Sequence, residues 1–242
     1  MQSINIQCIS HPWSTVHDLS IADPTGNWLL AGGLMVQVHA ILGGLPIRPT
    51  QDADLLMDLI SQPNEANRVR HLLSSFGFTI HPGTLTGYTT RMVSVNGSIV
   101  DVLVADHLPN HLAKESTYSG FPILPMPGGA QAIERSMTVE IDSGTDRFPL
   151  RVPDLLGATM LKSAAWETDK ARDRSRHLSD AALLLSLMRE PQIELARLHS
   201  KTDRKRIRTL TQHLGRDAEA WDFLNLDHRR YGLRALQILA QY

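Results

Sequence analysis

The spacing of hydrophobic residues changes character near residue 150. Before it, short apolar segments typical of strands alternate with segments whose apolar residues recur at helical spacing. The predicted elements are a strand over 26–32, a helix over 33–42, a strand over 52–59 and a helix over 64–78. Residues 107–150 are rich in turns and show little periodicity, and beyond Pro153 the spacing is helical only. The pattern predicts a mixed α/β (α+β) unit over residues 1–150, followed by an all-helical unit over residues 151–242.

One turn stands out in the first unit. Asn96-Gly97 separates two apolar segments, and this dipeptide favours a two-residue type I′ hairpin turn. Such a turn sets Met92 opposite Asp101 on the neighbouring strand. Asp101 is then flanked by Val and Ile within a strand, where a lone carboxylate is costly to bury unless it is paired or bound to a metal.

Two aspartates stand one residue apart at the start of the strand predicted over 52–59. Residues i and i+2 of a strand point to the same face, so Asp52 and Asp54 lie side by side. Two carboxylates this close raise each other's pKa unless a cation lies between them. Mg²⁺ suits this position, because it binds one or two carboxylates together with substrate phosphates. The alternative is a solvated strand end with two unrelated aspartates.

Two further features favour the metal site. Gly32-Gly33 lies at a predicted strand-to-helix junction, where free backbone N–H groups and the positive helix end suit a phosphate, although a plain tight turn also explains the pair. The predicted hairpin also brings Asp101 into the same sheet as Asp52 and Asp54. Three carboxylates at one end of a sheet are typical of a two-metal site.

Composition narrows the class of protein. The chain has 242 residues, of which 42% are hydrophobic and 20% are charged, so it can build an ordinary core. Its single cysteine, Cys8, excludes an internal disulfide framework and an all-cysteine metal site. We find no signal-peptide pattern, and no apolar stretch approaches the roughly 20 residues of a membrane helix. These observations predict a cytoplasmic protein without a membrane partner.

Charge is distributed unevenly between the two units. Residues 1–150 contain 7 Lys/Arg and 13 Asp/Glu, whereas residues 151–242 contain 17 Lys/Arg and 12 Asp/Glu. This split favours cations bound by the first unit and an anionic partner bound by the second, with ordinary surface variation as the alternative. The most basic helical segment is a candidate for contact with an RNA backbone or, alternatively, a solvated helix face. Its basic residues are Lys201, Arg204, Lys205, Arg206 and Arg208.

The order of these motifs resembles that of a known superfamily. An apolar residue, Gly32-Gly33, a spacer, Asp52 and Asp54 in Asp-x-Asp, and Asp101 on a later strand resemble nucleotidyltransferases of the DNA polymerase β type. The spacer is longer than in the shortest members of that superfamily. The segment "RPTQDAD" at 48–54 is similar to the AbiEii-like toxin nucleotidyltransferases.

The helical half carries a second part of the resemblance. Lys162 on one predicted helix and Asp180 on the next match the AbiEii-like pattern of a helix lysine, a basic cluster and a following aspartate. His177 departs from this pattern, because many relatives have an aspartate there. Both Lys162 and Asp180 fall on apolar helix stripes, so a structural salt bridge between the two helices is the alternative interpretation.

The resemblance implies transfer of a nucleoside monophosphate from a nucleoside triphosphate to an acceptor hydroxyl, with Mg²⁺ or Mn²⁺ as the cofactor. It implies that Asp52, Asp54 and Asp101 bind the metal, and that Asp101 accepts the proton of the attacking hydroxyl. As further catalytic residues, Lys162 would bind the triphosphate, and Asp180 would orient Lys162 or a hydroxyl of the ligand. The implied nucleotide-binding residues are Gly32, Gly33, Arg48, Thr50 and Lys162.

Three functions remain open at this point. The first is a toxin of a toxin–antitoxin pair that modifies tRNA through the basic C-terminal half and is controlled by an antitoxin protein. The second is an antibiotic-modifying nucleotidyltransferase with a small-molecule acceptor, although a cationic drug would need an acidic pocket. The third is a non-catalytic nucleotide-binding or partner-binding protein, which retention of all three carboxylates disfavours.

Overall fold

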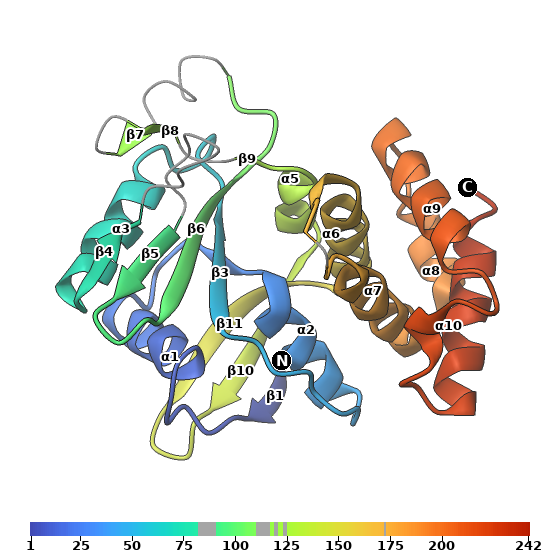
Figure 1. Cartoon of the computed structure of the whole chain (residues 1–242), viewed down its shortest axis with the longest axis horizontal. Coiled ribbons are helices and arrows are strands. Elements are labelled where there is room, and N and C mark those ends of the chain that lie inside the picture. The colour runs from blue at the N-terminus through green and yellow to red at the C-terminus, as the bar shows by residue number, and fades with distance from the viewer. Residues whose placement is uncertain (82–90, 110–116, 119–120, 123–124, 172) are drawn as a thin grey trace.

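The computed structural model describes residues 1–81, 91–109, 117–118, 121–122, 125–171 and 173–242. Figure 1 shows the sheets on one side of the molecule and helices α6 to α10 on the other. The elements of the first part are β1 (Gln2–Asn5), α1 (Trp13–Ala22), β2 (Leu29–Leu30), α2 (Gly32–Leu42), β3 (Asp52–Met57), α3 (Glu65–Ser75), β4 (Phe78–Ile80), β5 (Arg91–Ser94), β6 (Ile99–Ala105), β7 (Thr117–Tyr118), β8 (Phe121–Pro122), β9 (Pro125–Met126), α5 (Gly129–Glu134), β10 (Ser136–Asp142) and β11 (Arg147–Pro153).

The larger sheet has the strand order β2-β3-β6-β5-β4, and β9 also pairs with β6. β3 and β6 run parallel, whereas β2, β5 and β4 are antiparallel to their neighbours. The register sets Asp54 of β3 directly opposite Asp101 of β6. The prediction that the two strands belong to one sheet is therefore confirmed, and the sheet brings their carboxylates to adjacent positions.

The hairpin between β5 and β6 has a different register from the predicted one. The backbone amide of Ser94 donates to the carbonyl of Ser98, so the loop has three residues rather than two, and Gly97 closes it at a φ of 80°. This geometry is a turn followed by a left-handed residue, for which Gly97 is the suitable side chain. The change of one residue sets Arg91 opposite Asp101, so the prediction of Met92 at that position is wrong. Residues 88–90 of the predicted first strand lie outside the described residues.

A second sheet has the order β1-β10-β11, and the sequence pattern did not predict it. Val139 and Ile141 of β10 and Leu150 and Val152 of β11 are buried at alternating positions, as expected for a sheet with one covered face. β11 ends at Pro153, just before the first helix of the C-terminal part. The expectation that residues up to 150 form mostly turns is wrong for these two strands.

From Leu155 onward the described elements are helical. They are α6 (Leu155–Thr168), α7 (Ser175–Leu187), α8 (Pro191–Ala196), α9 (Lys201–His213), the 3₁₀ helix η1 (Glu219–Trp221) and α10 (Leu226–Leu239). The Asp154 side chain caps α6, and a capping box at Ser200 and Asp203 begins α9, so the polar residues before these helices fix where they start.

Helices α6 and α7 join the two parts of the molecule. Leu161 and Leu184 belong to the core that contains the sheets, whereas Leu156 and Leu185 belong to the core of the helical part. Arg135 and Asp203 add a buried ion pair, at 2.8 Å, between α5 and α9. A domain boundary near residue 150 stays a prediction. Within the described part of the chain, none of the helices has the length and apolar character needed to cross a membrane.

Candidate functional site

The predicted carboxylates form a cluster at one end of the larger sheet. One carboxylate oxygen from each of Asp52, Asp54 and Asp101 lies within 4.8 Å of the other two. Such spacing lets one or two divalent cations bind oxygen atoms from adjacent strands. The sequence prediction that these three residues come together is therefore confirmed by their positions.

Asp54 carries the electrostatic signature of a cation site. Burial, followed by the like charges of Asp52 and Asp101, raises its pKa to about 7, even though Lys162 and Arg91 oppose the shift. The protein alone therefore leaves excess negative charge at this position. A divalent cation would neutralise that charge, so the donor set and its electrostatics both fit Mg²⁺ or Mn²⁺.

The start of α2 is built closely around the cluster. Gly32 has a φ of 62°, and a β-carbon there would lie 1.6 Å from Oδ2 of Asp54. A β-carbon on Gly33 would lie 2.6 Å from Oγ1 of Thr50. Only glycines allow both approaches, and no side chain caps this helix N-terminus. The first amides of α2 therefore form a candidate anion site beside the carboxylates.

Thr50 positions one of the carboxylates. Its hydroxyl donates to Oδ1 of Asp52 at 2.7 Å, which fixes the rotation of that side chain. Thr50 also lines the cleft in front of the cluster. Its observed contact is with Asp52, so direct binding of a nucleotide by Thr50 stays a prediction.

The sequence interpretation did not identify Arg91 as part of this site. From β5, its Nε donates to Oδ1 of Asp101 at 3.0 Å and its Nη2 donates to Oδ2 at 2.7 Å. This bidentate contact follows from the three-residue loop, which brings Arg91 opposite Asp101. The lone carboxylate that the sequence places among apolar residues thus has a guanidinium partner.

Lys162 and Asp180 meet between α6 and α7. The Lys162 ammonium lies 2.8 Å from Oδ2 of Asp180, and Nη2 of Arg48 lies 3.3 Å from each oxygen of the same carboxylate. Burial opposes ionisation of Asp180, but the charges of Lys162 and Arg48 prevail and lower its pKa. The structure therefore contains the predicted salt bridge and adds Arg48 to it.

A cleft of about 500 Å³ unites most of the predicted residues. Asp180 lies behind Lys162 and lines a smaller, mainly apolar neighbouring pocket of about 320 Å³, together with Arg48 and Gly33. The residues that line the larger cleft are Gly32, Gly33, Arg48, Pro49, Thr50, Gln51, Asp52, Asp54, Arg91, Asp101, Met126, Leu161, Lys162, Ala165, Asp173, Arg176 and His177. The three aspartates and the basic side chains of Arg48, Arg91, Lys162 and Arg176 thus line one cleft, a combination that suits a metal-bound polyphosphate.

His177 also lines the cleft, next to the helix turn that carries Asp180. Its Nε2 lies 2.9 Å from Oδ2 of Asp169, and Arg176 contacts the same carboxylate at 3.1 Å. Burial lowers the pKa of His177 despite the Asp169 charge, so the ring is neutral at pH 7. The neutral ring donates from Nε2 to the Asp169 carboxylate, which fixes the orientation of the ring in the cleft.

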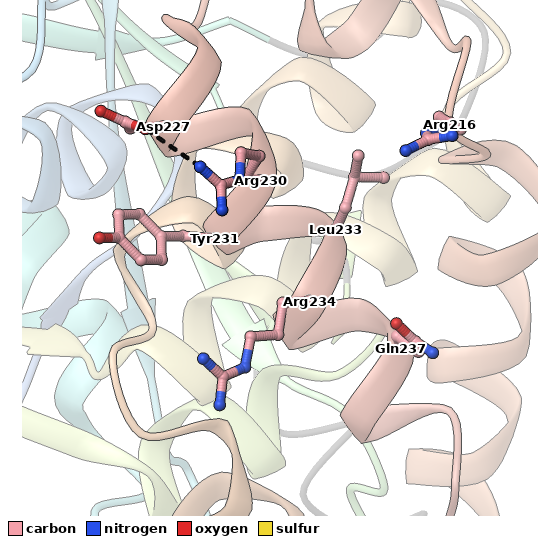
Figure 2. A pocket seen from close by; sticks show the side chains of 7 residues that line it. All are labelled: Arg216, Asp227, Arg230, Tyr231, Leu233, Arg234 and Gln237. Carbon is pink, nitrogen blue, oxygen red and sulfur yellow. Dashed lines mark ion pairs between the residues drawn. The ribbon is translucent and has the colours of Figure 1, made fainter.

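A second, basic cleft lies on the helical part, about α10. It has a volume of about 550 Å³, and Arg216, Arg230 and Arg234 are exposed there. Figure 2 shows these side chains with Tyr231 and Gln237, and with Asp227 paired to Arg230 at 3.7 Å. The surface is therefore suited to an anionic partner.

The basic segment on α9 is less available than the sequence suggests. Arg206 is buried and pairs with Glu167, which Lys205 also contacts at 2.8 Å. The Arg204 guanidinium lies over the ring of Tyr242, 5.1 Å from its centre. These contacts hold part of the basic segment against its neighbours, whereas Lys201 and Arg208 of α9 are exposed, so α9 and α10 both present exposed basic side chains.

Comparison with known proteins gives a weak structural similarity. No protein-family model matches the chain, and no curated protein matches it. Among solved structures, the chain is similar to an antigenic nucleotidyltransferase-like protein from Paracoccidioides brasiliensis. The two share 15% sequence identity with a TM-score of 0.49, over 93% of this chain and 90% of the other. At this level the match establishes no activity for the chain.

Proposed function

We propose that the chain is a metal-dependent nucleotidyltransferase that moves a nucleoside monophosphate from a nucleoside triphosphate to an acceptor hydroxyl. The observation that carries the proposal is the cluster of Asp52, Asp54 and Asp101, whose carboxylate atoms lie within 4.8 Å of one another. A cleft with glycines at a helix N-terminus and a buried lysine faces that cluster. Phosphoryl transfer depends mainly on such positioning and charge neutralisation.

In this proposal the triphosphate binds to the start of α2 and to the basic side chains of the cleft. The amides of Gly32 and Gly33 donate to phosphate oxygens, and Lys162 contributes a point charge. Asp180 holds Lys162 in place, since the two are 2.8 Å apart and nearly fully buried. Arg48 shares Asp180 and reaches the same phosphates from the loop before β3.

The chemical step uses the three carboxylates of the cluster. Asp52 and Asp54 would hold Mg²⁺ or Mn²⁺, which would supply charge neutralisation and lower the pKa of the attacking hydroxyl. Asp101 accepts the proton of that hydroxyl as its oxygen forms a bond to the α-phosphorus. The bond from that phosphorus to the β-phosphate oxygen breaks, and pyrophosphate leaves past Lys162.

A nucleic acid, such as tRNA, is the acceptor that the charge distribution favours. The exposed arginines of α10 would bind its phosphates, and Gly232 of this helix adjoins Ser186 near the C-terminal end of α7. His177, near the other end of α7, lines the catalytic cleft. His177 and Ser186 are separated by roughly 14 Å along the axis of α7, so this helix connects the catalytic cleft to the helix that carries the basic cleft.

The wider biological part of the proposal is a toxin controlled by an antitoxin protein. It rests on the sequence resemblance of "RPTQDAD", Lys162 and Asp180 to AbiEii-like toxins. Expression of the chain would then arrest growth, whereas expression of Asp52→Ala would not. Equal growth arrest by both forms would contradict a toxin role that depends on nucleotidyl transfer.

One experiment separates this function from its alternatives. The protein and Asp52→Ala are each incubated with Mg²⁺, total tRNA and one α-labelled nucleoside triphosphate at a time. We expect label on tRNA with the wild type and none with the variant. In a parallel incubation with a hydroxyl-bearing antibiotic, label on that antibiotic but not on tRNA would instead indicate an antibiotic-modifying enzyme. Nucleotide binding without turnover would indicate a non-catalytic nucleotide-binding protein.

A further inference from the structure

Arg91, Asp101 and Asp54 form a row across three neighbouring strands. Arg91 of β5 is the ladder partner of Asp101 on β6, which in turn is the partner of Asp54 on β3. Directly opposite residues point to the same face of a sheet, so the guanidinium and the two carboxylates share one surface. Among the described residues, Arg91 is the cation that forms an ion pair with a carboxylate of the cluster.

The contact occupies both oxygens of Asp101. Nε and Nη2 of Arg91 donate to Oδ1 and Oδ2, at 3.0 and 2.7 Å. A second divalent cation that bound Asp101 would have to lie within a few ångströms of this positive charge. The repulsion would be large, because the electrostatic energy of two charges this close is only partly screened by solvent.

Charge balance points the same way. Three ionised carboxylates and one arginine carry a net charge of −2, which one divalent cation neutralises. Two divalent cations would leave a net positive cluster unless Arg91 withdrew or a polyphosphate arrived with the second ion. Lys162 and Arg48 share the single carboxylate of Asp180, so this neighbouring group adds a net charge of +1 that further disfavours a second divalent cation.

Arg91 can withdraw, whereas Asp101 cannot. The Arg91 side chain is 44% exposed and the Asp101 side chain is 12% exposed, and both line the cleft. A swing of the arginine about its own torsions moves the guanidinium into the cleft that the triphosphate would fill. A planar guanidinium binds the oxygens of a phosphate as readily as it binds those of a carboxylate.

We propose that Arg91 holds the place of the second metal ion in the free protein and moves from Asp101 to a phosphate when that ion enters with the nucleotide. The inference rests on the proposed function. Arg91 is a positioning residue in this account: it limits the free protein to one tightly bound divalent cation, and it delays exposure of Asp101 until substrate is present.

Binding of Mn²⁺ in the absence of nucleotide tests this directly. Binding to the wild type and to Arg91→Met is followed at pH 8 by electron paramagnetic resonance of the free ion. We expect one tight Mn²⁺ site in the wild type and two in Arg91→Met. The second site of the variant should bind Mn²⁺ at least about tenfold more tightly than any second site of the wild type. Arg176→Met removes a different arginine of the same cleft, and we expect the wild-type number of sites. Thermal melts establish that each variant is folded.

The possible outcomes separate the two proposals. Equal Mn²⁺ number and affinity in the wild type and Arg91→Met would overturn the role of Arg91 and leave the proposed function intact. A second site in Arg176→Met as well would also overturn it, because any lost positive charge would then suffice. Absence of Mn²⁺ binding in every folded form would overturn the metal site and the proposed function together.

Discussion

The carboxylate of Asp54 lies directly against the α-carbon of Gly32. A β-carbon at position 32 would fall 1.6 Å from Oδ2 and 2.5 Å from Cγ of Asp54. The Asp54 carboxylate therefore fills the space that a side chain at position 32 would need. This contact explains why a glycine stands at the start of the helix in the same cleft as the carboxylates.

Replacing Gly32 should separate backbone strain from damage to the site. Gly32→Ala places a side chain at a φ of 62° and against Asp54, whereas Gly44→Ala has a φ of 67° and, among the described residues, no heavy atom within 4 Å. Both should lose about 1–2 kcal/mol of unfolding free energy through the left-handed backbone. Gly32→Ala should lose more, because Asp54 must move away from the new side chain. Only Gly32→Ala should weaken Mn²⁺ binding, measured by calorimetry. A similar loss of Mn²⁺ affinity in Gly44→Ala would show that strain alone is responsible.

Stability of the metal-free protein should depend on the ionisation of Asp54. Its pKa is raised to about 7 in the folded state, so folded protein retains a proton that unfolded protein releases near pH 4. The resulting stabilisation is complete below about pH 4 and is lost as the pH rises to about 7. Asp54→Asn should therefore stabilise the chain at pH 8 by about 1–3 kcal/mol, after allowance for the partial exposure of the carboxylate.

Thermal melts in EDTA at pH 5.5 and pH 8 measure that effect. The wild type should lose stability relative to Asp54→Asn between the two pH values, and Mg²⁺ should restore it at pH 8. A constant difference between the two proteins across this range would contradict the raised pKa. The same titration predicts that Mg²⁺ binding to the wild type strengthens as the pH rises through about 7, because binding displaces the proton of Asp54.

The Lys162–Asp180 pair allows its structural and functional roles to be separated. Asp180→Asn leaves the nearly fully buried Lys162 without its anionic partner and should cost about 3–5 kcal/mol in urea unfolding. The double variant Lys162→Met with Asp180→Leu removes both charges and should recover most of that stability. Triphosphate affinity should remain lost in the double variant. Retained affinity there would show that the pair is a structural salt bridge only.

Thr50 should act through Asp52. Thr50→Val removes the hydroxyl that donates to Oδ1 of Asp52 at 2.7 Å while keeping the shape of the side chain. Loss of one such hydrogen bond costs about 1 kcal/mol, so Mn²⁺ affinity should fall about fivefold. Thr50→Ser restores the hydroxyl and should restore the affinity in the same calorimetric titration. Failure of serine to restore it would place the effect in packing against Gly33.

Much of the carboxylate site could be predicted from the sequence because its determinants are local. Alternation along β3 sets Asp52 and Asp54 on one face, and Asn96-Gly97 marks a hairpin whatever its loop length. The position of Arg91 could not be predicted, because Asn-Gly fits both a two-residue and a three-residue loop. A difference of one residue in that loop exchanges Met92 for Arg91 beside Asp101.

The second sheet and the position of Lys162 could not be predicted from local patterns. The alternation of Val139 and Ile141 in β10, and of Phe148 and Leu150 in β11, was present in the sequence but lay in a segment dominated by turn residues. No periodicity brings Lys162 to the cleft beside β3, since that contact joins residues more than a hundred positions apart. The family resemblance predicted that Lys162 belongs to the site. The packing of α6 against the core that contains the sheets explains why it lies there.

Turnover of a nucleoside triphosphate by matched aspartate variants tests the central claim most directly. Asp52→Asn removes a ligand of the cluster, whereas Asp58→Asn alters an aspartate just beyond β3 that accepts from Ile60 and Ser61 instead. Pyrophosphate release is measured for each protein with Mg²⁺, total tRNA and each nucleoside triphosphate in turn. We predict equal rates for the wild type and Asp58→Asn, and a rate lower by about a hundredfold or more for Asp52→Asn. Equal rates for all three proteins, or no release by the folded wild type with any of the nucleotides, would contradict the account.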